Sequence, residues 1–205
     1  MLICLLLAAG SCKKFLEVKP LDTLSGNDFW KTRGDAQKAI NGTYALLLDK
    51  YTRSILYNVG DFRAGNWNWF DKTNLRMLGT NRMLNTGNGD GAEDPRDWLG
   101  FYKTIAYANL CIDRIPGIDD PVFSSREKKA LVAEARFIRA FVYFIMVRLY
   151  GDVPLQMDPY DITLRPREKM LAVLDVSLKD LDACKDDLRL IYDERPSRGV
   201  RATNG

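Results

Sequence analysis

Apolar side chains recur close to helical spacing in the first quarter of the chain. Between residues 28 and 50 the repeated positions are Trp30, Ala36, Ile40, Tyr44 and Leu47. Side chains spaced in this way share one face, so the pattern predicts an amphipathic helix that begins near Asp28. Ser25 or Asn27 stands where an N-terminal cap is expected.

Two further segments show the same spacing. From Trp98 to Ile115 the pattern predicts a second helix, which Pro116 and Gly117 should end. Near the C-terminus a helix is predicted from about Pro166 to about Leu188, and its apolar positions are Leu171, Leu174, Leu178 and Leu181. We expect the tail after this helix to add no closing element.

The longest predicted helix lies between Ser124 and Gly151. Ser124 and Glu127 have the spacing of a capping box, and neither proline nor glycine interrupts the segment before Gly151. Its middle reads EARFIRAFVYF. The small and aromatic side chains there predict a packing seam, formed by Ala135, Phe137, Ala140, Phe141 and Phe144. Charged neighbours could pair with other helices, and these are Glu134, Arg136 and Arg139.

No strand-like alternation extends beyond a few residues, so the fold class is mainly α. The predicted architecture is a set of tetratricopeptide-like antiparallel helix pairs with long irregular loops. The longest loop spans residues 51–96, contains six glycines and clusters Trp67, Trp69 and Phe70. Loops of this length are commonly functional or mobile.

Composition removes several kinds of chemistry. The chain of 205 residues has a net charge of +3, which argues against a nucleic-acid partner. It contains no histidine, so serine–histidine and cysteine–histidine nucleophile pairs and histidine-based zinc sites are excluded. No two carboxylates stand in an evident glycosidase pair. We therefore expect no catalytic residue, no metal and no cofactor.

The first residues are typical of a secretion signal. Residues 1–11 read MLICLLLAAGS, carry no charge and are too short to span a bilayer. The small residues before Cys12 fit a bacterial lipobox, in which the cysteine thiol is lipidated. This pattern predicts a lipoprotein signal peptide over 1–11, lipidation at Cys12 and a tether over 12–26. The usual basic start is missing, and a buried N-terminal strand is the alternative.

Two other cysteines, Cys111 and Cys184, lie within predicted helices. A disulfide between them is open in an oxidising compartment, but two separate core residues fit the helical positions better.

One short stretch has the composition of a sugar site. Residues 60–70 read GDFRAGNWNWF, in which indole rings can cover the C–H faces of a sugar while polar groups bind its hydroxyls. The candidate ligand-binding residues are Asp61, Arg63, Asn66, Trp67 and Trp69. The alternative is that the two tryptophans only pin the loop to the helical body.

The chain resembles the SusD/RagB family of outer-membrane lipoproteins. The resemblance rests on EARFIRAFVYF with the following RLYGDVPL, on the CKKFLE start after the lipobox, and on Trp98, Tyr102, Ile105 and Asn109 in the second helix. Asp180 and Leu181 in the last helix also match. Family members are longer, so residues 27–205 resemble the N-terminal helical domain.

The resemblance implies binding without catalysis. It implies a surface-exposed lipoprotein, held in the outer membrane by its lipid anchor, that captures an oligosaccharide or another nutrient. The implied partner is a SusC-like TonB-dependent transporter, to which the nutrient is delivered. The alternative function is a helical-repeat interaction module without a ligand site of its own. A cytoplasmic adaptor is excluded only if Cys12 is lipidated.

Overall fold

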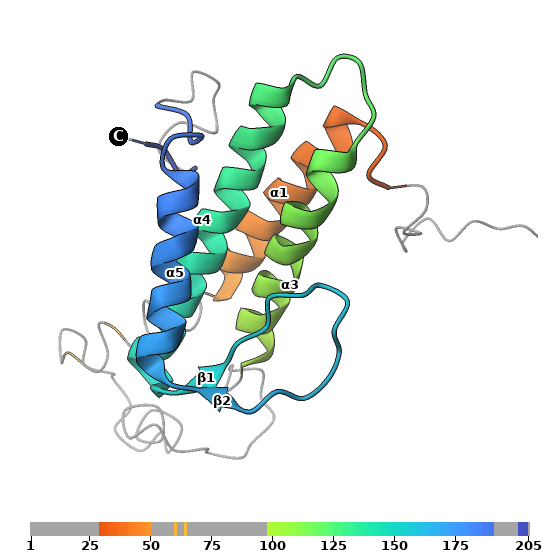
Figure 1. The fold of residues 1–205 in the computed structure, drawn as a ribbon. Coiled ribbons are helices and arrows are strands. Elements are labelled where there is room, and N and C mark those ends of the chain that lie inside the picture. Colours follow the sequence, from red (N-terminus) through yellow and green to blue (C-terminus); the bar gives the residue numbers. More distant parts are fainter. Residues whose placement is uncertain (1–28, 51–59, 61–63, 65–97, 191–200, 205) are drawn as a thin grey trace, which may run out of the picture.

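The computed structural model describes residues 29–50, 60, 64, 98–190 and 201–204. Within this part the helices are α1 (Arg33–Lys50), α3 (Leu99–Arg114), α4 (Ser125–Tyr150) and α5 (Met170–Cys184). A short 3-10 turn, η3 (Ile115–Gly117), follows α3. Two short strands, β1 (Val153–Pro154) and β2 (Arg167–Glu168), pair antiparallel (Figure 1).

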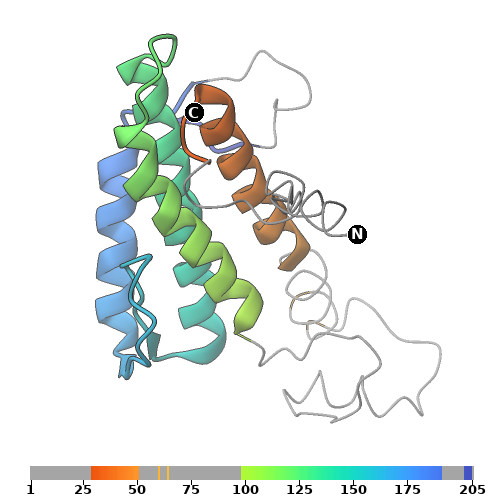
Figure 2. The ribbon, with the colours of Figure 1, turned by 90° about the vertical axis from the view of Figure 1, so that its right-hand side faces the viewer.

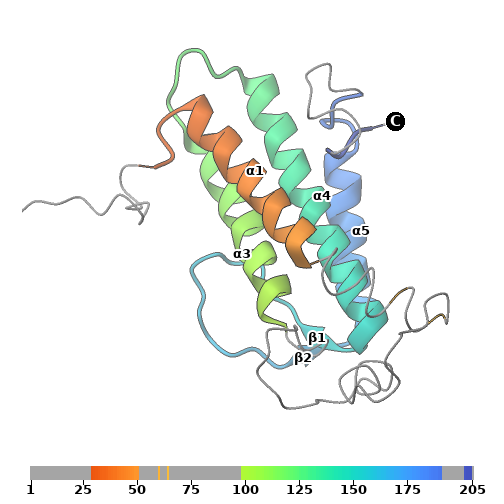
Figure 3. The same ribbon diagram turned by 180° about the vertical axis from the view of Figure 1, so that it is seen from behind.

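Helix α4 is the centre of the structure, because α1, α3 and α5 all pack against it. Successive helices run in opposite directions, and α1 and α5 lie on opposite sides of α3 and α4 (Figure 2). Seen from behind, α1 lies across both α3 and α4 (Figure 3). This arrangement confirms the predicted mainly α fold of tetratricopeptide-like antiparallel helices.

The apolar faces predicted from the sequence meet in two main clusters. One joins α3, α4 and α5 and is centred on Phe101, Ile105, Ile138, Met146 and Val173. The other joins α1, α3 and α4 and is centred on Ala36, Ile40, Cys111, Leu131 and Ala135. Small residues at Ala36 and Ala135 are fully buried, which lets the helices approach closely.

The predicted ends of α4 are confirmed. The Ser124 hydroxyl oxygen accepts a hydrogen bond from the Glu127 N–H at 3.3 Å, while the Glu127 carboxylate accepts from the Ser124 N–H at 3.2 Å. This is the reciprocal capping box. At the other end Gly151 has φ 72°, a conformation that favours glycine.

The predicted start of α1 is wrong. The helix begins at Arg33, because Trp30 adopts φ 71° and turns the chain away from helical geometry. Thr32 and Asp35 then cap it reciprocally: the Thr32 Oγ1 accepts from the Asp35 N–H at 3.2 Å, and the Asp35 carboxylate accepts from the Thr32 N–H at 3.0 Å. The spacing alone could not reveal the left-handed residue.

The bounds of α5 also differ from the prediction. It begins at Met170 rather than near Pro166, because Arg167 and Glu168 are extended and pair with β1. The carboxylate of Asp152 accepts a hydrogen bond from the Met170 N–H at 3.0 Å and so caps the helix start from outside. The helix ends at Cys184 rather than Leu188.

The tail does return to the helical body, contrary to the expectation. Ala202 is buried beside Ala133, Cys184 and Leu188, and its N–H donates to the Tyr44 hydroxyl at 2.9 Å. Residues 201–204 therefore cover part of the α1–α4 surface.

The prediction for Phe144 was wrong. Its ring is 43% exposed, with the Arg148 guanidinium 5.2 Å from the ring centre, so it does not contribute to the buried seam. The other members of the predicted seam behave as expected: Ala135 and Ala140 are buried, and Phe137 stacks on Phe141 with 6.2 Å between the ring centres.

Candidate functional site

The residues predicted to bind a nutrient lie outside the part of the chain that the structure describes. They are Asp61, Arg63, Asn66, Trp67 and Trp69, and the lipidation candidate Cys12 lies outside it as well. Their assignments stay predictions. The described residues show instead which contacts fix the EARFIRAFVYF segment of α4 in the bundle.

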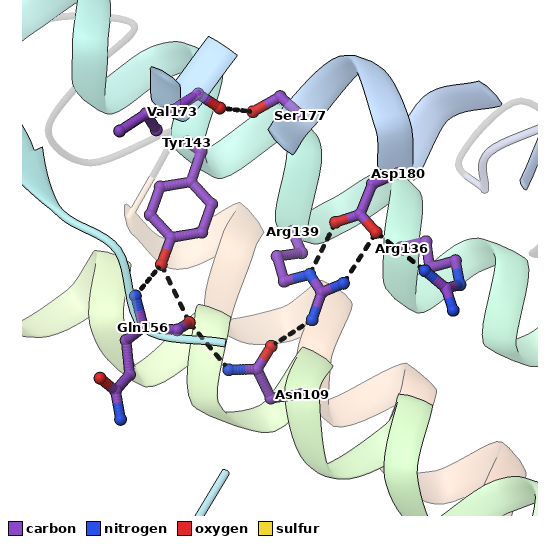
Figure 4. A network of polar contacts seen from close by, with 8 residues as sticks. All are labelled: Asn109, Arg136, Arg139, Tyr143, Gln156, Val173, Ser177 and Asp180. Carbon is purple, nitrogen blue, oxygen red and sulfur yellow. Dashed lines mark hydrogen bonds and ion pairs between the residues drawn. The ribbon is translucent and has the colours of Figure 1, made fainter. Parts of the chain in front are cut away.

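A network of charged and polar side chains is buried where α3, α4 and α5 meet (Figure 4). Arg139 on α4 faces Asp180 on α5, and both of their nitrogen–oxygen contacts are 2.7 Å long. Arg136 contacts the same carboxylate at 3.0 Å. The third guanidinium nitrogen of Arg139 donates to the Asn109 amide oxygen on α3 at 2.7 Å. Each of the three helices thus contributes to the network, α4 with two residues and α3 and α5 with one each.

The network continues into the loop after β1. The Asn109 amide donates to the Gln156 carbonyl at 3.0 Å, and the Tyr143 hydroxyl accepts from the Gln156 N–H at 2.7 Å. Just before this loop, the Tyr102 hydroxyl donates to the carbonyl of Pro154, the last residue of β1, at 2.7 Å. Burial raises the pKa of Tyr143 to about 12, so the phenol stays protonated and able to donate.

This arrangement is built for positioning rather than for chemistry. The Arg139 and Asp180 side chains are 6% and 5% exposed, and each is already occupied by protein partners. A buried, bidentate pair of this kind is costly to break, because the remaining charge would have no counter-charge. The sequence predicted ion pairs from Arg136 and Arg139, and the structure identifies Asp180 as their shared partner.

A second buried ion pair joins α4 to the tail. The Glu134 carboxylate is fully buried and lies 2.7 Å from the Arg201 guanidinium. The same guanidinium lies over the aromatic ring of Tyr44. Burial, with a further contribution from the charge of Glu134, raises the pKa of the Tyr44 hydroxyl. The sequence indicated that Glu134 could pair, but it gave no signal for a partner 67 residues away.

The two cysteines are free and buried, as expected from their helical positions. Burial raises the pKa of the Cys111 thiol to about 12 and also raises that of Cys184. The thiolate is the reactive form of cysteine, so neither side chain is an activated nucleophile.

A pocket of about 360 Å³ opens between the first half of α4 and the end of α5. Its lining residues are Pro116, Ser125, Lys128, Lys129, Val132, Ala133, Arg136, Ala183 and Asp187. None of these residues is aromatic, so the pocket does not have the composition predicted for the sugar site. Lys128 is already engaged, donating to the Ile118 carbonyl at 2.5 Å.

The described residues offer neither a cluster of metal ligands nor a membrane-spanning helix. In residues 29–50, 98–190 and 201–204 no group of three or more histidine, cysteine or acidic side chains could hold a metal ion. None of the helices described is long and apolar enough to cross a bilayer.

Comparison with known proteins places this helical framework in a family. Residues 14–200 match the SusD-like family described as starch-binding and associating with the outer membrane. The match covers most of the chain, and the chain belongs to this family.

Two curated relatives illustrate the match. The chain is 31% identical to SusD-like protein P38 of Formosa agariphila over 187 residues, which is 89% of this chain and 35% of that protein. It is 26% identical to a SusD-like protein of Bacteroides ovatus over 89% of this chain and 33% of that protein. The chain thus spans about a third of the length of these curated relatives.

Solved structures agree with the fold. A SusD homologue from Bacteroides thetaiotaomicron superposes with a TM-score of 0.71 at 26% identity, covering 85% of this chain and 40% of that one. A laminarin-binding SusD-like protein superposes with a TM-score of 0.68 at 20% identity, covering 85% of this chain and 38% of that one. At that identity the second likeness shows the fold alone.

Proposed function

We propose that this chain is part of a nutrient-binding lipoprotein of the outer membrane that captures an oligosaccharide without transforming it. The observation that carries the proposal is family membership over residues 14–200. The family is described as starch-binding, and one protein of the same fold binds laminarin. A polysaccharide-derived ligand is therefore the first class to test.

The proposed ligand contacts are Asp61, Arg63, Asn66, Trp67 and Trp69. Their support is chemical, because indole faces and a nearby carboxylate, guanidinium and amide suit a sugar ring. The buried side chains where the helices meet are consistent with binding rather than catalysis. Its charged side chains, Arg139 and Asp180, are committed to holding helices together, and its cysteines are unreactive.

The proposed location is the cell surface, with Cys12 carrying the lipid. Several acyl chains on one residue give stable anchoring, whereas a single chain holds a protein only marginally. The proposed partner is a SusC-like TonB-dependent transporter in the same membrane, which would receive the nutrient. Both proposals come from the family resemblance and from the lipobox pattern before Cys12.

Affinity purification tests location and partner together. The protein is produced with a C-terminal tag from its own gene in its native host and extracted from the outer membrane. Cys12→Ala removes the lipidation candidate, and Cys4→Ala is the matched control inside the predicted signal peptide. We expect a TonB-dependent barrel, identified by mass spectrometry, to co-purify with the wild type and with Cys4→Ala.

Loss of Cys12 should release the protein from the membrane and reduce the amount of barrel recovered. Equal membrane association of Cys12→Ala and wild type would contradict the anchor. Absence of a barrel from all samples would contradict the transporter partner and favour the interaction-module alternative.

A further inference from the structure

Helix α5 turns most of its leucines away from the bundle. Leu171 and Leu178 are 72% and 64% exposed, Leu181 is 39% exposed, and only Leu174 packs partly against the core. The side chains that α5 buries are instead Val173, Ser177, Asp180 and Cys184. Figures 1 and 2 both show α5 at the outer edge of the bundle. The four leucines form the leucine stripe, which comprises Leu171, Leu174, Leu178 and Leu181.

The leucine stripe has the form of a packing seam. Its members follow one another at steps of three, four and three residues, so they share one side of the helix. A row of leucines with this spacing is the surface by which one helix packs on another. None of the described helices covers the stripe, although burying its apolar area would be favourable.

The spacing of the stripe is the same when it is read from either end, with its midpoint halfway between Leu174 and Leu178. If the α5 helix of a second copy runs antiparallel along it, Leu171 of each copy lies opposite Leu181 of the other. Leu174 then lies opposite Leu178 in both halves of the contact. A two-fold interface between identical chains requires one surface to match itself in this way.

The charges at the two ends of α5 are opposite in sign. Residues 165–169, just before the helix, hold three cations and one carboxylate, namely Arg165, Arg167, Lys169 and Glu168. Residues 182–187, at its end, hold three carboxylates and one cation, namely Asp182, Asp186, Asp187 and Lys185. This polarity is the reverse of what the helix dipole favours, because carboxylates stabilise the N-terminus of a helix and cations its C-terminus.

Part of this charge is compensated within the chain. Lys169 pairs with Asp152, Arg165 with Asp161, and Lys185 with Asp182. Asp186 and Asp187 form no ion pair with the described part of the chain. An antiparallel second copy would bring its cationic end beside these carboxylates, whereas a parallel copy would bring like charges together. Charge and spacing therefore favour the same arrangement.

We propose that the leucine stripe joins two copies of this chain in an antiparallel, two-fold dimer. The dimer does not depend on the proposed ligand or on the proposed transporter partner. A stripe on a single helix is smaller than a standard protein interface, which buries about 1,600 Å² in total. The dimer is therefore weak, and its population depends on protein concentration.

The oligomeric state of the full chain, purified in a mild detergent, tests the dimer. Light scattering after size-exclusion chromatography gives the protein mass across a series of concentrations. We expect this mass to rise toward that of two chains. Leu171→Ala with Leu178→Ala should lower the association constant at least about tenfold, because each lost side chain occurs twice in the dimer. The control Leu99→Ala changes a leucine on α3 that is 58% exposed and should leave association unchanged.

Thermal unfolding at a concentration where all three proteins are monomeric shows whether the variants keep their fold. A wild type that stays monomeric at every concentration would overturn the proposal. So would a double variant that keeps its fold and dimerises as well as the wild type.

Disulfide crosslinking tests the orientation. Leu174→Cys and Leu178→Cys are made in two copies of the full chain that carry different tags, and the copies are mixed and oxidised. The antiparallel dimer predicts faster crosslinking between position 174 and position 178 than between two copies of either variant alone. The wild type, whose Cys111 and Cys184 are buried, gives the background. Faster crosslinking of 174 to 174 and of 178 to 178 would show a parallel contact and overturn the proposal.

Discussion

Arg139 and Asp180 lie inside the bundle, while Ile162 and Leu164 stand at the tip of the loop between β1 and β2 in full contact with solvent. The usual distribution of polarity is thus reversed in both places. In the bundle every buried charge meets a counter-charge or an amide within 3.0 Å. At the tip, by contrast, the two aliphatic side chains are not buried against any other part of the described structure.

The difference separates two kinds of role. Buried ion pairs whose partners all belong to the chain are explained by the fold, because they specify how α3, α4 and α5 meet. The exposed aliphatic side chains of the loop between β1 and β2 contribute no buried packing to the described bundle. Substitutions in the first region should therefore affect stability, and substitutions in the second should leave stability nearly unchanged.

The largest effect is expected for Asp180→Ala. This change leaves Arg139 buried without its counter-charge, and the free energy of unfolding should fall by about 3–5 kcal/mol. The measurement is urea unfolding followed by circular dichroism. Asp175→Ala, on the same helix, breaks only the exposed pair with Lys179 and should cost less than about 1 kcal/mol. Equal unfolding midpoints for the two variants would contradict the role of the buried network.

The second-largest effect is expected for Arg201→Ala. The free energy of unfolding should fall by about 3 kcal/mol, because Glu134 remains buried without the guanidinium that pairs with it. Arg126→Ala, which removes an exposed guanidinium near the start of α4, is the matched control and should change stability little. Urea unfolding gives both values. A wild-type midpoint for Arg201→Ala would mean that the tail does not contribute to the fold.

Tyr143→Phe tests whether the buried network holds the loop between β1 and β2 in place. Losing the hydroxyl removes both hydrogen bonds to Gln156, and stability should fall by about 1–2 kcal/mol. Hydrogen exchange should speed up at the Gln156 amide, since its acceptor is gone. Tyr107→Phe changes an exposed tyrosine and serves as the control. An unchanged exchange rate at the Gln156 amide would show that the Tyr143 hydroxyl does not hold the loop between β1 and β2 in place.

The smallest effect on stability is expected for Ile162→Ser combined with Leu164→Ser. Both side chains are exposed, so the free energy of unfolding should stay within about 0.5 kcal/mol of the wild type. Ile138→Ala, in the core, should by contrast cost about 2–5 kcal/mol. A large loss of stability in the double variant would show that the tip has an intramolecular packing role after all.

The sequence predicted the helices better than it predicted what joins them. The capping box of Ser124 and Glu127 and the end of α4 at Gly151 depend on nearby residues, so a local pattern reveals them. The start of α1 failed because the backbone of Trp30 departs from helical geometry without a glycine or proline as a warning.

Long-range partners were the harder part of the prediction. The charges of Arg139 and Glu134 indicated ion pairs, but their partners, Asp180 and Arg201, lie 41 and 67 residues away. Two-residue strands such as β1 and β2 leave no alternating pattern to detect, so the loop between them and its exposed tip were missed. The candidate sugar residues, from Asp61 to Trp69, lie outside the described part and stay predictions.

Calorimetric titration of the full chain with oligosaccharides from starch and laminarin tests the central claim, nutrient binding through Trp67 and Trp69, most directly. We expect saturable binding of the wild type to at least one of these glycans. The double variant Trp67→Ala with Trp69→Ala should lose this binding. The control Trp98→Phe, which changes the half-buried indole beside Tyr102, should retain it. Binding that survives the loss of both tryptophans, or no binding to either glycan class by the wild type, would contradict the claim.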